Sequence, residues 1–135
     1  TIQAAVLIEK IEIFDNELIL RKKAAKYYTQ NINKKCIPPL VPDKYSSSWA
    51  QYSIITPGHS TRKRIVKKFV ENGIPSMIYY KIPVHLQKGY AKYGYKVGDF
   101  AISENISKRI LSLPMHPYLN KNNQNKILNI LNEID

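Results

Sequence analysis

Apolar residues recur at alternating intervals of three and four from the start of the chain. The positions are Ala4, Leu7, Ile11, Phe14, Leu18, Ala25 and Tyr28. This spacing places one apolar stripe along a helix, so it predicts a single amphipathic helix across about residues 1–31. We expect this helix to pack on another domain rather than to form a coiled coil, because the repeat covers few heptads.

The charges on this predicted helix are ordered along its length. Its first half carries Glu9, Glu12, Asp15 and Glu17, and its second half carries Arg21, Lys22, Lys23 and Lys26. That order complements the helix dipole, which favours a solvated helix end over a nucleic-acid patch. The chain opens inside the helix pattern with neither an initiator methionine nor a convincing cap. We therefore expect Thr1 to be the edge of a fragment.

The middle of the chain alternates short strands with helices. Residues 33–48 hold prolines and a serine run, which predicts a loop. WAQYSIIT then predicts a strand with Ala50, Tyr52 and Ile54 on one face. After a turn at Pro57-Gly58, we expect a helix that Ser60 or Thr61 caps and Gly73 ends. Its apolar positions are Ile65, Val66, Phe69 and Val70.

The second half of the chain repeats this alternation. SMIYY (residues 76–80) predicts a second strand, and HLQKGYAKYGYKVG predicts a short helix that gives way to a glycine-punctuated loop. We expect Asp99 to cap a helix, ILSLP to form a third strand, and Asn120 to cap the last helix. The apolar stripes of these helices are Ile102, Ile106 and Ile110, and then Ile127, Leu128, Leu131 and Ile134. The pattern predicts an α+β fold, a small sheet with helices on one face.

Charge and cysteine content limit the partners and the compartment. The formal charge of +11 allows nucleic acid, anionic membrane or phosphorylated ligands as partners. However, lysine, isoleucine, asparagine and tyrosine are abundant together and the basic residues are scattered, which favours a codon-driven bias. Cys36 is the only cysteine, so an internal disulfide is impossible and a reducing cytoplasm fits. The sequence contains neither a membrane-spanning apolar run nor a signal-peptide pattern.

The three histidines and one carboxylate are the candidate functional residues. No histidine has a metal-ligand spacing to another or to Cys36, so we expect no metal site. His59 precedes a helix start, and His116 lies between two prolines, so turns explain both. His85 follows a strand end, where either ligand contact or ordinary packing fits. We expect Glu104, within a helix, to be solvated or salt-bridged. No complete catalytic set is visible.

Six motifs, read in order, resemble the C-terminal part of one enzyme family. They are TIQAA, SWAQYSI, ENGIPSMIYYKIPVHLQKGY, GYKVGDF, SENIS and LSLPMHPYL. The string is similar to the DegT/DnrJ/EryC1/StrS aminotransferases, fold-type I enzymes that use pyridoxal phosphate to aminate keto sugars on nucleotides. Lys81 and Ala101 depart from the family pattern, which commonly has proline at both positions.

This resemblance implies a domain organisation. Residues 1–33 would form the helix that links to a large domain preceding Thr1, and residues 34–135 the small C-terminal domain with its antiparallel sheet. The Schiff-base lysine would precede Thr1, so no catalytic, cofactor-binding or metal-binding residue is expected in this chain, and the chain alone would be inactive. The parent enzyme would be a cytoplasmic homodimer in surface polysaccharide or amino-sugar biosynthesis.

The resemblance also implies a substrate. An amino group, from glutamate as the expected donor, would pass to the keto group of a nucleotide-linked sugar, with His85 contacting the substrate, Tyr80 beside it and Gln87 in support. Two alternatives stay open. One is a dehydratase of the same fold, in which the cofactor lysine is replaced. The other is a free-standing basic module that binds nucleic acid through residues 26–35 or 60–68.

Overall fold

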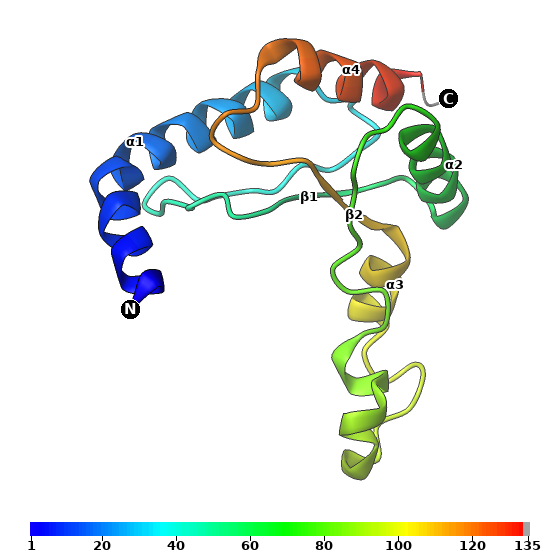
Figure 1. Ribbon diagram of the computed structural model, residues 1–135. Helices are drawn as coiled ribbons and strands as arrows, with labels where there is room; N and C mark the ends of the chain where they lie inside the picture. Colours follow the sequence, from blue (N-terminus) through cyan, green and yellow to red (C-terminus); the bar gives the residue numbers. More distant parts are fainter. Residues whose placement is uncertain (134–135) are drawn as a thin grey trace.

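The computed structural model describes residues 1–133, so Ile134 of the predicted last helix lies outside the described residues. The elements, in chain order, are α1 (Ile2–Asn31), β1 (Tyr52–Ile55), α2 (His59–Glu71), the 3-10 helices η1 (Val84–Leu86) and η2 (Lys88–Tyr93), α3 (Ala101–Arg109), β2 (Ile110–Leu113) and α4 (Lys121–Asn132). Figure 1 shows α1, α2 and α4 around the two strands, with the region from η1 to α3 extending away from them. This arrangement confirms the predicted α+β class.

The long first helix forms as predicted, but only its second half is packed. Thr1 caps it after all, since its hydroxyl oxygen accepts a hydrogen bond from the amide of Ala4 at 3.3 Å. The buried residues of α1 are Ala24, Ala25 and Tyr28. The apolar side chains of the first half are exposed, among them Leu7, Ile11 and Phe14. The predicted apolar stripe therefore exists, and half of it lacks a packing partner within residues 1–133.

The sheet has two strands among the described residues rather than the predicted three. β1 and β2 pair antiparallel, with Tyr52 opposite Leu113 and Ile55 opposite Ile110. The predicted strand at residues 76–80 makes only an isolated bridge, in which Met77 and Ser112 exchange hydrogen bonds of 3.2 and 2.8 Å. The strand prediction was wrong because the chain turns away at residues 79–82 before a ladder can extend.

Two helix starts differ from the sequence predictions. α2 begins at His59 after Gly58, so neither Ser60 nor Thr61 is its cap. α3 begins after Phe100 without a side-chain cap, because the Asp99 carboxylate instead accepts from the amide of Lys96 at 2.7 Å. These caps were mispredicted because polar residues lie close to each helix start, Ser60 and Thr61 at α2 and Asp99 at α3, and the turn geometry decides where the helix begins.

Two other helix boundaries agree with the sequence. Gly73 has the predicted left-handed φ of 65°, a conformation that costs glycine little, and it follows the end of α2. Asn120 caps α4, where its side-chain oxygen accepts from the amide of Asn123 at 2.8 Å. The stretch LSLPMHPYL accordingly forms the end of β2 and the turn into α4, as predicted.

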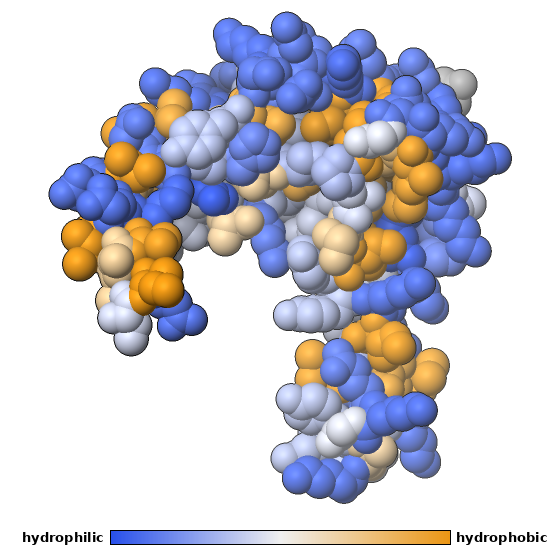
Figure 2. Space-filling model, in the orientation of Figure 1, coloured by the Kyte–Doolittle hydropathy of each residue, from blue (hydrophilic) through white to orange (hydrophobic). Residues whose placement is uncertain are grey.

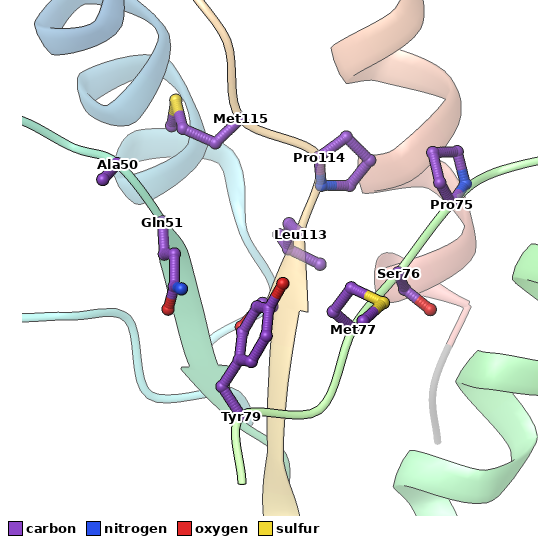
Figure 3. A pocket seen from close by; sticks show the side chains of 10 residues that line it. Ala50, Gln51, Pro75, Ser76, Met77, Tyr79, Leu113, Pro114 and Met115 are labelled. Carbon is purple, nitrogen blue, oxygen red and sulfur yellow. The ribbon is translucent and has the colours of Figure 1, made fainter.

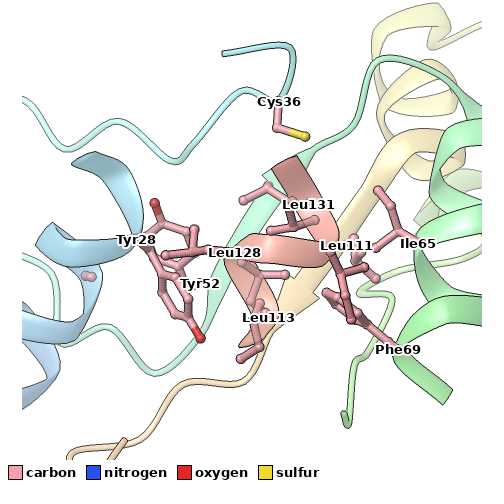
Figure 4. Close-up of a cluster of buried hydrophobic side chains, with 13 residues drawn as sticks. Tyr28, Cys36, Tyr52, Ile65, Phe69, Leu111, Leu113, Leu128 and Leu131 are labelled. Carbon is pink, nitrogen blue, oxygen red and sulfur yellow. The ribbon is translucent and has the colours of Figure 1, made fainter. Parts of the chain in front are cut away.

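The hydrophobic core lies between one face of the sheet and the helices α1, α2 and α4 (Figure 4). The sheet contributes Tyr52, Ile54, Leu111 and Leu113, and the helices contribute Ala25, Tyr28, Ile65, Phe69, Ile127, Leu128, Ile130 and Leu131. The rings of Tyr28 and Tyr52 have centroids 5.1 Å apart. The Tyr28 hydroxyl donates to the carbonyl of Pro114 at 3.1 Å, and burial raises the pKa of this phenol. The core thus packs α1 against the start of β1 and against the residue that follows β2.

Replacing Phe69, which is fully buried in this core, with alanine tests the packing. We expect Phe69→Ala to lower the free energy of unfolding by about 3–5 kcal/mol, because it leaves a cavity under α2. Val70 is the next residue of the same helix and 73% exposed, so Val70→Ala is the matched control. It should change the free energy by less than about 0.5 kcal/mol. Urea unfolding measures both, and equal losses would contradict the assigned core.

Candidate functional site

The candidate site lies in the arm, which we define as residues 79–104. This segment leaves the sheet after Met77, passes through η1 and η2, and returns along α3 to β2. In Figure 1 it is the light-green to yellow region that extends from the body of the molecule. The loop positions where His85, Tyr80 and Gln87 were predicted therefore all fall in one projecting unit.

The imidazole of His85 is fixed by a carboxylate inside the arm. Its Nε2 lies 3.1 Å from Oε1 of Glu104, and the two side chains are only 8% and 11% exposed. The same Oε1 accepts from the amides of Gly98 at 2.8 Å and Phe100 at 3.4 Å. The amide of Gly98, with help from His85, lowers the pKa of Glu104, while burial opposes this shift. Glu104 is thus buried and paired, not solvated.

Aromatic side chains lie beside His85 and line an open hollow of about 300 Å³. Its walls are Val84, His85, Tyr90, Tyr93, Tyr95, Phe100 and Ser103. The His85 ring packs on Phe100 with centroids 4.7 Å apart, and Tyr95 meets Phe100 edge-on at 5.1 Å. An imidazole in such a setting can hydrogen-bond a hydroxyl or an anionic oxygen beside an apolar surface.

The other two predicted binding residues do not share this hollow. Tyr80 is 66% exposed, and its ring meets that of Tyr79 edge-on at 6.0 Å. The side-chain amide of Gln87 donates to the carbonyl of Ile82 at 3.3 Å. Gln87 therefore braces the turn before η1, and the phenol of Tyr80 lies on the surface of the arm.

A second hollow, of about 200 Å³, lies where the arm joins the sheet (Figure 3). Tyr79 and Met77 line one side of this hollow, and Gln51 lines another. Pro114 and Met115, which follow the end of β2, complete its wall. Sequence reasoning missed Gln51 and Met115 as wall residues. The signal that could have found them is their place directly beside strand ends, where binding groups often lie.

The remaining histidines have structural surroundings. Nδ1 of His59 lies 3.0 Å from the carbonyl oxygen of Lys108 and 3.3 Å from Nη2 of Arg62. His116 is exposed in the turn that leads to α4. Within residues 1–133, no group of three or more histidine, cysteine, aspartate or glutamate side chains could hold a metal ion.

One arginine of the basic segments is engaged inside the fold. Arg62, in the segment 60–68, is buried, and its guanidinium donates to the carbonyl of Ser107 at 2.7 Å. That arginine braces α2 against the end of α3 and is not available to an outside anion. No helix within residues 1–133 is both long and apolar enough to cross a membrane.

A Schiff-base lysine needs a desolvated setting that lowers the cost of its neutral form. Every lysine of the chain is exposed to solvent in the structure. The described residues therefore do not fit pyridoxal phosphate as a covalently held group. What they hold is an imidazole, that of His85, beside an aromatic hollow.

Comparisons with known sequences place these features in a wider setting. The sequence profile of the DegT/DnrJ/EryC1/StrS aminotransferase family matches residues 1–132. The chain is 34% identical to the UDP-2-acetamido-2-deoxy-3-oxo-D-glucuronate aminotransferase of Pseudomonas aeruginosa, over 88% of this chain and 32% of that protein. It is 28% identical to the dTDP-3-amino-3,6-dideoxy-alpha-D-galactopyranose transaminase of Aneurinibacillus thermoaerophilus, over 97% and 35%. The chain thus spans about a third of the length of these relatives.

Solved structures give the same picture of the fold. A DegT DnrJ EryC1 StrS aminotransferase from Brucella abortus matches with a TM-score of 0.86 and 40% identity, over 96% of this chain and 34% of that one. DesV of S. venezuelae, solved with a ketimine intermediate, matches with a TM-score of 0.88 and 23% identity, over 97% and 35%. At the lower identity, the likeness concerns the fold alone.

The lowered pKa of Glu104 predicts a pH dependence. Because folding favours its carboxylate form, this stabilisation is present above the unfolded pKa and is lost as the pH falls through the folded pKa. We expect stability to fall as the pH drops below about 5, through the ordinary glutamate value of about 4.3 and toward the lower folded pKa, and Glu104→Gln to reduce this dependence. Urea unfolding across this range is the measurement.

The control for this experiment removes a surface carboxylate instead. Glu71 lies 3.9 Å from Lys67, and both side chains are exposed. Glu71→Gln should change the unfolding free energy by less than about 0.5 kcal/mol at each pH. A Glu104→Gln protein with the wild-type pH profile would contradict the assigned role of the Glu104 carboxylate.

Proposed function

The chain belongs to the DegT/DnrJ/EryC1/StrS aminotransferase family, as its motifs indicate, and from this we propose that it is the C-terminal part of a nucleotide-sugar aminotransferase. Residues 1–33 are the connecting helix and residues 34–135 the small domain. The enzyme transfers an amino group, with glutamate as donor, to a keto group of a nucleotide-linked sugar. The observation that carries the proposal is the family match across residues 1–132. The relatives from Pseudomonas aeruginosa and Aneurinibacillus thermoaerophilus both bear names of nucleotide-sugar aminotransferases.

The first half of α1 supports the proposed domain organisation. Leu7, Ile11 and Phe14 are all more than half exposed, although they form one apolar stripe. Contiguous apolar surface of this kind marks a contact with another protein surface. We assign that contact to the large domain of the same polypeptide.

Pyridoxal phosphate, when bound, would supply the electron sink for amino transfer. Because every lysine of this chain is exposed, the lysine that holds the cofactor is proposed to lie outside it, and the chain alone to be inactive. The contribution of this chain is one wall of the substrate pocket. His85 is the proposed contact to a sugar hydroxyl or a diphosphate oxygen, the exposed phenol of Tyr80 adds a second contact, and Gln87 supports the turn.

The proposed enzyme is a cytoplasmic homodimer that acts in surface polysaccharide or amino-sugar biosynthesis. A dehydratase of the same fold is the second candidate, because the residue that separates the two chemistries lies outside this chain. Whether the complete protein holds the cofactor on a lysine distinguishes the two.

The first experiment uses the full-length protein that contains this chain. After addition of pyridoxal phosphate and borohydride reduction, we expect mass spectrometry to find the cofactor on one lysine outside residues 1–135. Glutamate-dependent amination of a nucleotide-linked keto sugar should accompany it, and the 135-residue chain should catalyse none. A histidine in place of that lysine would favour the dehydratase, and turnover by the isolated chain would contradict the proposed division of labour.

The second experiment replaces His85 with alanine in the full-length enzyme. We expect KM for the nucleotide sugar to rise about tenfold with little change in kcat, the loss of roughly one hydrogen bond to a charged group. His116→Ala removes an exposed imidazole from the same chain and is the matched control. It should leave KM unchanged. If the His85 variant also kept the wild-type KM, the proposed contact would be wrong.

A further inference from the structure

Three donors from different parts of the arm converge on one oxygen atom of Glu104. They are Nε2 of His85 and the amides of Gly98 and Phe100. We propose that Glu104 is a positioning residue for substrate binding, which sets the tautomer and the orientation of His85 so that its Nδ1 faces the ligand. This inference rests on the proposed contact between His85 and the nucleotide sugar.

The tautomer follows from the chemistry of the carboxylate. An ionised carboxylate only accepts hydrogen bonds, so the hydrogen between the two groups must be on Nε2 of His85. In a neutral ring, Nδ1 is then an acceptor, and in a protonated ring it is a donor. Without Glu104, the neutral ring could carry its hydrogen on either nitrogen and could rotate.

The second nitrogen of the ring is available to a ligand. Within residues 1–133, Nδ1 of His85 has no hydrogen-bond partner, and no side-chain nitrogen or oxygen that is fully buried lacks one. Nδ1 therefore reaches solvent, although the side chain as a whole is 8% exposed. His85 also lines the aromatic hollow, so a ligand could contact its Nδ1 and an apolar wall at the same time.

The carboxylate is itself held rigidly. The amide of Glu104 donates to the carbonyl of Phe100 at 3.0 Å, while the amide of Phe100 donates back to the Glu104 side chain. Gly98, with a φ of 101°, turns its own amide toward the same oxygen, a backbone conformation that L side chains rarely adopt. The Phe100 ring then covers the His85 ring. The start of α3, the loop before it and His85 therefore form one unit centred on Glu104.

Glu104→Ala and Glu104→Gln in the full-length enzyme separate positioning from general loss of structure. Glu104→Gln keeps an oxygen that can accept all three hydrogen bonds, so we expect KM for the nucleotide sugar to stay within about threefold of wild type. Glu104→Ala should raise KM about tenfold and leave kcat nearly unchanged. In the His85→Ala background, Glu104→Ala should have little further effect, because the two residues act through one contact.

Nitrogen-15 NMR of the imidazoles gives a readout that needs no substrate. In the wild-type protein, His85 should carry hydrogen on Nε2, and Glu104→Ala should change that pattern. Glu71→Ala is the control for loss of an exposed carboxylate and should change neither the spectrum of His85 nor KM.

The outcomes separate this inference from the proposed function. If His85→Ala raises KM but Glu104→Ala does not, the positioning role is overturned and the substrate contact stands. If Glu104→Ala has its full effect in the His85→Ala background, it acts through general structure and the inference is overturned. A neutral His85 with hydrogen on Nδ1 in the wild-type protein would overturn it even if no alanine variant folded.

Discussion

The antiparallel pairing of β1 with β2 is the constraint on which the other elements depend. It joins Tyr52 to Leu113 and Ile55 to Ile110, so everything between residues 56 and 109 is a closed loop of chain. Closing so long a loop costs conformational entropy, which the burial of one sheet face under α1, α2 and α4 offsets. The arm starts just after the Met77–Ser112 bridge beside this pair, and α3 leads from it back into β2. The strand pairing therefore sets the position of the arm, and contacts made by the residues of the arm that lie far from the sheet do not.

Elements whose signal is local could be predicted from the sequence. The spacing of apolar residues identified α1, Gly73 marked the end of α2, and Asn120 marked the start of α4. In each case the residues that define the element are close neighbours along the chain, so propensity and capping decide it. Residues 76–80 failed as a strand because a ladder needs a partner along its whole length, and the chain turns away at residues 79–82.

The buried face of α3 was mispredicted for a related reason. Its apolar spacing suggested Ile102 on the inner face, yet Ile102 is 79% exposed, and Glu104 with Ser107 is buried. A short helix presents whichever face its neighbours require, and here the neighbours are His85 and the Gly98 amide. A sequence pattern cannot show that the fold brings three hydrogen-bond donors to one carboxylate. His85 was proposed from its place after a strand end, and Tyr80 and Gln87 from their place in the same segment, so all three roles stay predictions.

Two exposed apolar surfaces give the domain its asymmetry. One is the first half of α1, and the other is the arm, where Tyr93, Val97 and Ile102 are exposed. Figure 2 shows both surfaces as apolar groups on two separate projecting parts of the molecule, with an open space between them. The sheet and its three helices bury their own core fully, so the first half of α1 and the arm add little to the stability of residues 1–133. A body that filled the space between them would cover both at once.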